Sequence, residues 1–331
     1  MILKIAFIYQ APTSFIEKDL EMLGKQYKVN PLRFKRLRDV LKLFEAVRKA
    51  DMTMVWFGKL HAFFAVLFSK ILRKRIIIIA GGDDVARQTS LGRPYGIFGH
   101  PVKKWFGRFI FSHADRVIAI SEYNYQEVLA NTPVLPEKVI LIAHGFDLGL
   151  FFRREDINKE DIVVTVGTID AENYWRKGFY LIKDIARLLP KISFYIIGPH
   201  HGDVIKKLER GRPDNLFFPG PLYGVELVAM LSRAKVYLQL SEWESFGCAL
   251  AEAMLCECVP VVYRGTALPE VIGDAGLYVE CFEPKIVAQT VEKALQSTDL
   301  GPCARERIVE KFPLKKRQEA LLKEVALSAA D

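Results

Sequence analysis

The chain has 331 residues, of which 50% are hydrophobic and 26% are charged. This length predicts two domains, and the composition excludes a disordered or low-complexity protein. The net charge of +8 favours partners that carry phosphate groups, but charge alone does not choose among nucleic acid, anionic lipid and nucleotide.

Short apolar runs alternate with amphipathic segments from the first residues onward, which predicts parallel sheets with helices on both faces. The candidate strands fall into two series. The first series is residues 4–9, 52–57, 75–80, 116–120 and 139–143, and the second is 162–166, 193–197, 236–240, 259–263 and 277–279. The predicted fold class is therefore α/β, with two Rossmann-like, doubly wound domains that face a cleft.

The two series are separated by a charged, non-periodic stretch at 145–161, which indicates a linker. We predict an N-terminal acceptor domain over 1–150 and a C-terminal donor domain over 161–305. Residues 306–331 are predicted to form helices, divided by Pro313, that pack back toward the N-terminal domain.

No basic leader precedes the first strand, and no run reaches about 18 apolar residues. We therefore expect a cytoplasmic protein. Its five cysteines are odd in number and form no pair of CxxC units, so we expect reduced thiols rather than disulfides or a zinc site.

Two segments of the first half, 60–75 and 103–111, mix aromatic and basic residues. Such helices can lie at the surface of an anionic bilayer, which predicts a peripheral membrane protein at the inner membrane surface. The alternative is an ordinary core helix with basic ends. We find no nucleic-acid-binding motif and expect no nucleic-acid partner.

A strand at 163–166 is followed by Gly167 and then by Arg176-Lys177-Gly178 at the start of a helix. A lysine at this place can reach a phosphate, and Arg176 could supply a second cation. The alternative is an exposed basic helix start. Cations are disfavoured at the N-terminus of a helix, and a bound anion would offset this unfavourable interaction.

The segment with the most candidate ligand-binding residues is 241–254, where a turn containing Gly247 leads into an apolar helix. The first amides of that helix point outward and favour a diphosphate. Glu244 lies before the helix, and Glu252 lies about two turns inside it, where a carboxylate could accept both ribose hydroxyls. The alternative is a chance pair of glutamates on a solvated helix.

No GxGxxG turn follows the first strand, which argues against a Rossmann dehydrogenase.

Five segments together resemble the retaining GT-B glycosyltransferases called family 4, within glycosyl transferases group 1. They are 112–121, 139–147, Glu244-Ser-Phe-Gly with Glu252, 259–262 and 269–272. The resemblance implies a hexosyltransferase-like enzyme that moves a sugar from a nucleotide-diphospho-sugar to a sugar or lipid-linked hydroxyl, with retention and with neither a cofactor nor a metal ion.

The resemblance also implies roles for individual residues. Lys177 would hold the diphosphate, Glu244 would touch the transferred sugar, and Glu252 would hold the ribose. The full set expected to contact the donor is Gly167, Arg176, Lys177, Ser245, Phe246, Gly247 and Glu252.

The chain departs from the family pattern at three places, the first of which is residues 10–14, which replace the glycine-rich first loop of the family. Thr168 stands where the family has an arginine, and Asp83-Asp84 stand where many members have a histidine. We expect Asp83 or Asp84, together with Glu244 and Lys177, to take part in catalysis. These aspartates, or His200-His201, could suggest a metal site, but the chain has no Asp-x-Asp motif and we expect none. The missing arginine supports an alternative, a catalytically inactive nucleotide-sugar-binding homologue or partner subunit.

Overall fold

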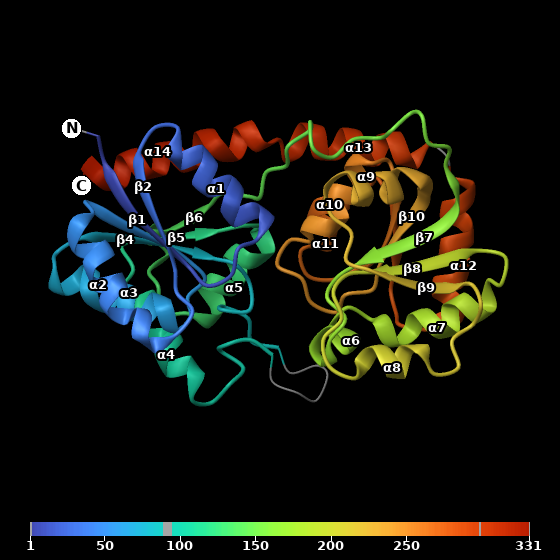
Figure 1. Ribbon diagram of the computed structural model, residues 1–331, viewed down its shortest axis with the longest axis horizontal. Helices are drawn as coiled ribbons and strands as arrows, with labels where there is room; N and C mark the ends of the chain where they lie inside the picture. The colour runs from blue at the N-terminus through green and yellow to red at the C-terminus, as the bar shows by residue number, and fades with distance from the viewer. Residues whose placement is uncertain (1, 89–94, 298, 331) are drawn as a thin grey trace. The chain divides into compact units, whose positions relative to one another are not determined.

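We describe residues 2–88, 95–297 and 299–330 of a computed structural model of the chain. The chain divides into two compact units, each with a single sheet and helices around it (Figure 1). The first unit is Met1–Gly145 with Lys315–Asp331, and the second is Phe146–Leu314. The observed fold confirms the predicted α/β class with two Rossmann-like domains.

The sheet of the first unit has six parallel strands in the order β2-β1-β3-β4-β5-β6. Their bounds are β1 Lys4–Tyr9, β2 Lys28–Arg33, β3 Met52–Trp56, β4 Arg75–Ala80, β5 Arg116–Ala119 and β6 Val139–Leu141. The helices are α1 Ser14–Gly24, α2 Val40–Lys49, α3 Leu60–Ile71, α4 Lys103–His113, α5 Glu122–Asn131 and α14 Leu314–Ala330, with short 3-10 turns at Leu37–Asp39 and Pro136–Lys138.

Helices α2, α3 and α4 pack side by side over one face of this sheet and share its hydrophobic core. Because α3 lies between the other two, the segment 60–75 forms a core helix with a basic end, as the second of our two alternatives predicts. Helix α4 differs, since Val102, Trp105 and Phe106 at its start are 62%, 66% and 45% exposed.

A buried ion pair joins the last helix, α14, to α1. The Arg317 guanidinium donates to the Asp19 carboxylate through Nε at 2.8 Å and Nη2 at 2.7 Å, and the indole of Trp56 donates to the same carboxylate at 3.0 Å. The side chains of Arg317 and Asp19 are only 2% and 0% exposed, so each charge depends on the other.

The second unit contains another parallel sheet, in the order β12-β11-β10-β7-β8-β9. Its strands are β7 Glu160–Val166, β8 Ser193–Ile197, β9 Leu216–Gly220, β10 Ala234–Gln239, β11 Val259–Tyr263 and β12 Leu277–Val279. Its helices are α6 Ala171–Arg176, α7 Phe179–Leu188, α8 Val204–Glu209, α9 Gly224–Arg233, α10 Cys248–Leu255, α11 Leu268–Ile272, α12 Pro284–Gln296 and α13 Leu300–Lys311.

The strand order of the second unit reverses between β7 and β10, which makes this pair the topological switch point of the sheet. In open α/β sheets, ligands bind beyond the carboxyl ends of the strands at such a point. Helices α7 and α12 share the hydrophobic core on one face, and α10 packs against β10 and β11.

All ten predicted strands are present, and Pro313 separates α13 from α14 as predicted. Two further strands, β2 and β9, were not predicted. Both are edge strands, and both contain a proline, Pro31 and Pro219. Among the described residues, no helix is long and apolar enough to cross a membrane.

Candidate active site of the second unit

Two polar segments meet where β7 and β10 end. Arg176 and Lys177 follow β7 through the short helix α6, while Ser241 and Glu244 follow β10 directly. Since β7 and β10 are hydrogen-bonded parallel neighbours, their carboxyl ends lie at the same edge of the sheet. The residues predicted from two separate motifs therefore come together at the switch point.

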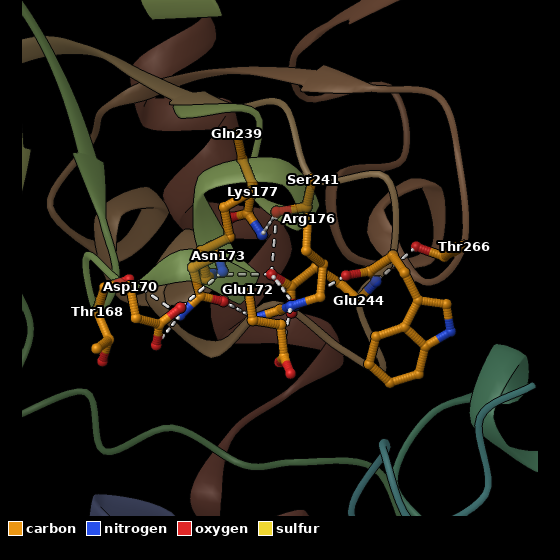
Figure 2. Close-up of polar contacts among 11 residues, drawn as sticks. Thr168, Asp170, Glu172, Asn173, Arg176, Lys177, Gln239, Ser241, Glu244 and Thr266 are labelled. Carbon is orange, nitrogen blue, oxygen red and sulfur yellow. Dashed lines mark hydrogen bonds and ion pairs between the residues drawn. The ribbon is translucent and has the colours of Figure 1, made fainter. Parts of the chain in front are cut away.

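Glu244 lies at the centre of this cluster (Figure 2). Its Oε1 accepts from Lys177 Nζ at 2.8 Å and from the Ser241 hydroxyl at 3.0 Å, and Arg176 Nη1 lies 3.3 Å from the same oxygen. The three charged side chains are only 12–15% exposed. Two cations therefore converge on one carboxylate at the site.

The protonation state of Glu244 follows from these contacts. Burial alone would raise its pKa, but the charges of Lys177 and Arg176 and the hydrogen bonds from Lys177 and Ser241 lower the pKa to about 2. Glu244 is therefore ionised at neutral pH, and it holds the two cations in fixed positions.

Two glycines allow the chain to pass close to the cluster. A Cβ on Gly167 would lie 2.8 Å from Cδ of Lys177, so any larger residue here would push the lysine side chain from its present position. Gly247 has a φ of +100° and precedes the first residue of α10, a conformation that other residues rarely adopt. It turns the chain into α10, whose first-turn amides lack intrahelical partners by the geometry of any helix.

Glu252 lies in the second turn of α10 and is partly buried. Burial raises the pKa of its carboxyl group to about 8. Among the described residues, no hydrogen bond or ion pair reaches this carboxyl group. A carboxylate in this situation is unfavourable unless a partner arrives, and ligand hydroxyl groups are suitable partners.

The two glutamates act on a common neighbour, Tyr237 of β10. Burial raises the pKa of the Tyr237 hydroxyl well above its ordinary value, and the charges of Glu244 and Glu252 add to this rise. The side chain of Tyr237 is fully buried.

The other predicted donor contacts lie in the turn between β10 and α10. The ring of Phe246 is 1% exposed and packs against Phe146 and Phe312, so this side chain belongs to the core. A donor contact by Phe246 would therefore involve its backbone amide rather than its ring. Ser245 is partly exposed beside it.

Asp83 and Asp84 belong to the first unit, in the loop after β4. The Asp84 carboxylate is fully buried and accepts from the backbone amides of Gly58, Gly81 and Gly82 at 2.6, 3.1 and 2.7 Å. Burial, with the charge of Asp83, raises the pKa of Asp84 to about 6 despite these bonds.

Through these hydrogen bonds, the Asp84 carboxylate connects the loop after β3 to the loop after β4. Asp83 is 35% exposed and pairs with Lys59 at 2.7 Å, so it is the more accessible of the two for a ligand. In the described ranges, no group of three or more His, Cys, Asp or Glu side chains is arranged to hold a metal ion.

The sequence reasoning missed four members of the network, which Figure 2 labels: Asn173, Gln239, Ser241 and Thr266. Asn173 and Ser241 contact Arg176 and Glu244 directly, and the Thr266 hydroxyl accepts from the Glu244 amide at 3.1 Å. Gln239 donates to the Ser241 hydroxyl at 3.3 Å. The Asp170-x-x-Asn173 spacing, typical of a capped helix start, was the one local signal available.

Residues 150–312, nearly the whole second unit, match the family described as glycosyl transferases group 1. The chain therefore carries a glycosyl transferases group 1 domain. Lys177, Glu244 and Glu252 all lie within it.

Several curated relatives match parts of the chain. Alpha-maltose-1-phosphate synthase of Mycolicibacterium smegmatis is 26% identical over 65% of the chain, and a phosphatidylinositol N-acetylglucosaminyltransferase component of Arabidopsis thaliana is 24% identical over 57%. The chain matches only 63% and 43% of the lengths of these relatives.

Among solved structures, Anabaena HepE in complex with UDP-glucose matches with a TM-score of 0.80 at 15% identity. The match covers 98% of this chain and 99% of that one. The two-unit architecture around the group 1 domain is therefore the GT-B fold.

Proposed function

We propose that this chain is a retaining glycosyltransferase of family 4 that moves a sugar from a nucleotide-diphospho-sugar to an acceptor hydroxyl. The observation that carries the proposal is the convergence of Lys177, Arg176 and Glu244 at the switch point of the group 1 domain. The glycosyltransferase relatives and the fold support the same conclusion.

The two neighbouring cations of this cluster suit a diphosphate leaving group. When the bond between the sugar and the diphosphate breaks, negative charge develops on the phosphate oxygen. Lys177 and Arg176, already fixed by Glu244, would stabilise that charge without having to reorganise. The amide-lined start of α10 beside Gly247 would add donors to the same group.

Glu252 supports a nucleotide rather than a simple phosphate as the ligand. Its carboxyl group has no protein partner among the residues that the structure describes, and vicinal ribose hydroxyls could donate two hydrogen bonds to it. The first probes are UDP and UDP-glucose, because HepE, which shares the fold, was solved with UDP-glucose.

Retention suggests attack on the same face from which the diphosphate leaves. Three donors already occupy Glu244, which favours a role in positioning for it over a role as covalent nucleophile. In the proposed step, the acceptor oxygen bonds to the anomeric carbon as the bond from that carbon to phosphate oxygen breaks. The acceptor proton passes to the leaving phosphate oxygen. This step calls for no metal ion or cofactor.

For the acceptor, we propose a sugar or a lipid-linked hydroxyl presented at the cytoplasmic face of a membrane. The start of α4 exposes Val102, Trp105 and Phe106 beside the exposed cations Lys103 and Lys104. Apolar side chains flanked by cations suit an anionic bilayer. One relative also carries phosphatidylinositol in its name.

The test is a screen of UDP-glucose and other common nucleotide sugars for thermal stabilisation and for slow hydrolysis by the pure protein. Wild-type protein is expected to hydrolyse at least one of them. Lys177→Ala is expected to lower the rate, because one of the two cations that face the leaving group is lost. The matched control is Lys285→Ala, which removes an exposed lysine of the same unit.

Binding without any hydrolysis or transfer would favour the alternative, an inactive nucleotide-sugar-binding homologue or partner subunit. Absence of both binding and turnover for the whole panel would refute the proposal. Full activity of Lys177→Ala would refute the role of the lysine.

A further inference from the structure

Asn173 lies on α6, one helical turn before Arg176, and is 8% exposed. Its Oδ1 accepts from Arg176 Nη2 at 2.6 Å (Figure 2). Its Nδ2 donates to the Thr168 carbonyl at 2.9 Å and to Asp170 Oδ2 at 3.2 Å. The carboxamide therefore joins the end of β7 to the guanidinium that faces Glu244.

These contacts allow only one orientation of the carboxamide. A guanidinium can only donate, whereas a carbonyl and a carboxylate oxygen can only accept. The oxygen of Asn173 must therefore face Arg176, and its nitrogen must face Thr168 and Asp170. The backbone amide of Asn173 also donates to Asp170 Oδ1 at 2.7 Å, which fixes the base of the side chain.

The guanidinium of Arg176 is in turn held at several points. Nη2 is bound by Asn173, and Nη1 donates to the Trp243 carbonyl at 2.9 Å and lies 3.3 Å from Glu244. Glu172 lies 4.0 Å from Nε, and its side chain is 64% exposed. Of these partners, Asn173 is the one that contacts Nη2. Its acceptor oxygen belongs to a neutral, buried side chain, and the residue lies on the same helix as Arg176.

We infer that Asn173 is the positioning residue that holds Arg176 as the second cation of the phosphate site. The inference rests on the proposed function and deepens it. Thr168 offers no charge where the resemblance predicts an arginine, but its carbonyl anchors the carboxamide that fixes Arg176. Arg176 of α6, three residues after Asn173, thus supplies the cation that is missing after Gly167.

A double-mutant cycle on UDP binding tests this inference. Calorimetric dissociation constants are measured for the wild type, Asn173→Ala, Arg176→Ala and the double variant. Asn173→Ala should weaken UDP binding by about fivefold to tenfold, because one charge-assisted hydrogen bond that orients the cation is lost. If Asn173 acts through Arg176, the double variant should bind no more weakly than Arg176→Ala alone.

The matched control is Asn215→Ala in the same unit. Asn215 also donates to backbone carbonyls, those of Ala186, Leu189 and Ile192, but it does not contact Arg176. It should lower the unfolding temperature and leave UDP affinity unchanged. Asn173→Asp, which preserves the shape of the side chain but places an acceptor against Thr168 and Asp170, serves as a second variant if Asn173→Ala unfolds.

Additive effects in the cycle, or unchanged UDP affinity of folded Asn173→Ala, would overturn the inference and leave the proposed function standing. If wild-type protein binds neither UDP nor any nucleotide of the panel, the proposed function fails, and this inference fails with it.

Discussion

The partly buried carboxyl group of Glu252 makes a prediction that links stability to function. We expect Glu252→Gln to make the ligand-free protein more stable at neutral and alkaline pH and to weaken its binding of UDP. The charge is costly without a partner, and glutamine removes the charge while preserving the size of the side chain.

The magnitude follows from the pKa of about 8 in the folded chain against the ordinary value of 4.5. Below pH 4.5 the group is protonated in both the folded and the unfolded chain and costs nothing. Above pH 4.5 only the unfolded chain releases the proton, so folding stability falls as the pH rises and levels off above pH 8. At about 1.4 kcal/mol for each pKa unit, the loss between pH 5 and pH 8 is about 3–4 kcal/mol.

The assay is urea-induced unfolding of the wild type and Glu252→Gln at pH 5, 7 and 8. The difference in unfolding free energy between the two proteins should grow by about 3–4 kcal/mol across this range in favour of the variant. The cost of burying the glutamine amide does not depend on pH, so it cancels when the difference in unfolding free energy is compared between pH values. Glu292→Gln, which removes an exposed glutamate of the same unit, is the control and should show no such growth. Parallel stability curves for the wild type and Glu252→Gln would refute the reasoning.

Two further predictions concern the first unit. Arg317→Met should lower its unfolding free energy by about 3–5 kcal/mol, because the Asp19 carboxylate loses its charged partner inside the core; a loss below about 1 kcal/mol in urea unfolding would contradict this. Replacing Trp105 and Phe106 together by serine should reduce co-sedimentation with vesicles of anionic phospholipid by about tenfold or more, since each aromatic ring contributes about 1.5–3 kcal/mol when it leaves water. Leu327→Ser, which removes an exposed apolar residue on α14, is the control, and equal sedimentation of all three proteins would argue against membrane contact through α4.

The strands that the sequence predicted are those with continuous apolar runs, such as β4, whose residues 76–80 are all buried. The two that it missed, β2 and β9, are two of the four edge strands. An edge strand needs fewer buried side chains and tolerates proline, so Pro31 and Pro219 made β2 and β9 resemble loops.

At the candidate site, the motifs located Lys177 and Glu244 separately, but the sequence did not show that the two side chains pair. Their ion pair depends on the adjacency of β7 and β10, which are about 70 residues apart and become neighbours only through the sheet order. Asn173 and Ser241 act through contacts that carry no distinctive spacing. Asp84 was a candidate because it stands where many members of the resembled family have a histidine. Only the loop conformation reveals the three amides that it binds.

Because α14 belongs to the first unit, the group 1 domain is inserted within the sequence of that unit. The chain passes from one unit to the other twice, near residues 145 and 314. A premature stop shortly after α13 would therefore preserve every residue of the candidate site in the second unit and still damage the first unit, since Asp19 would lose Arg317. In such a chain, loss of activity would report a folding defect of the first unit rather than a change at the candidate site.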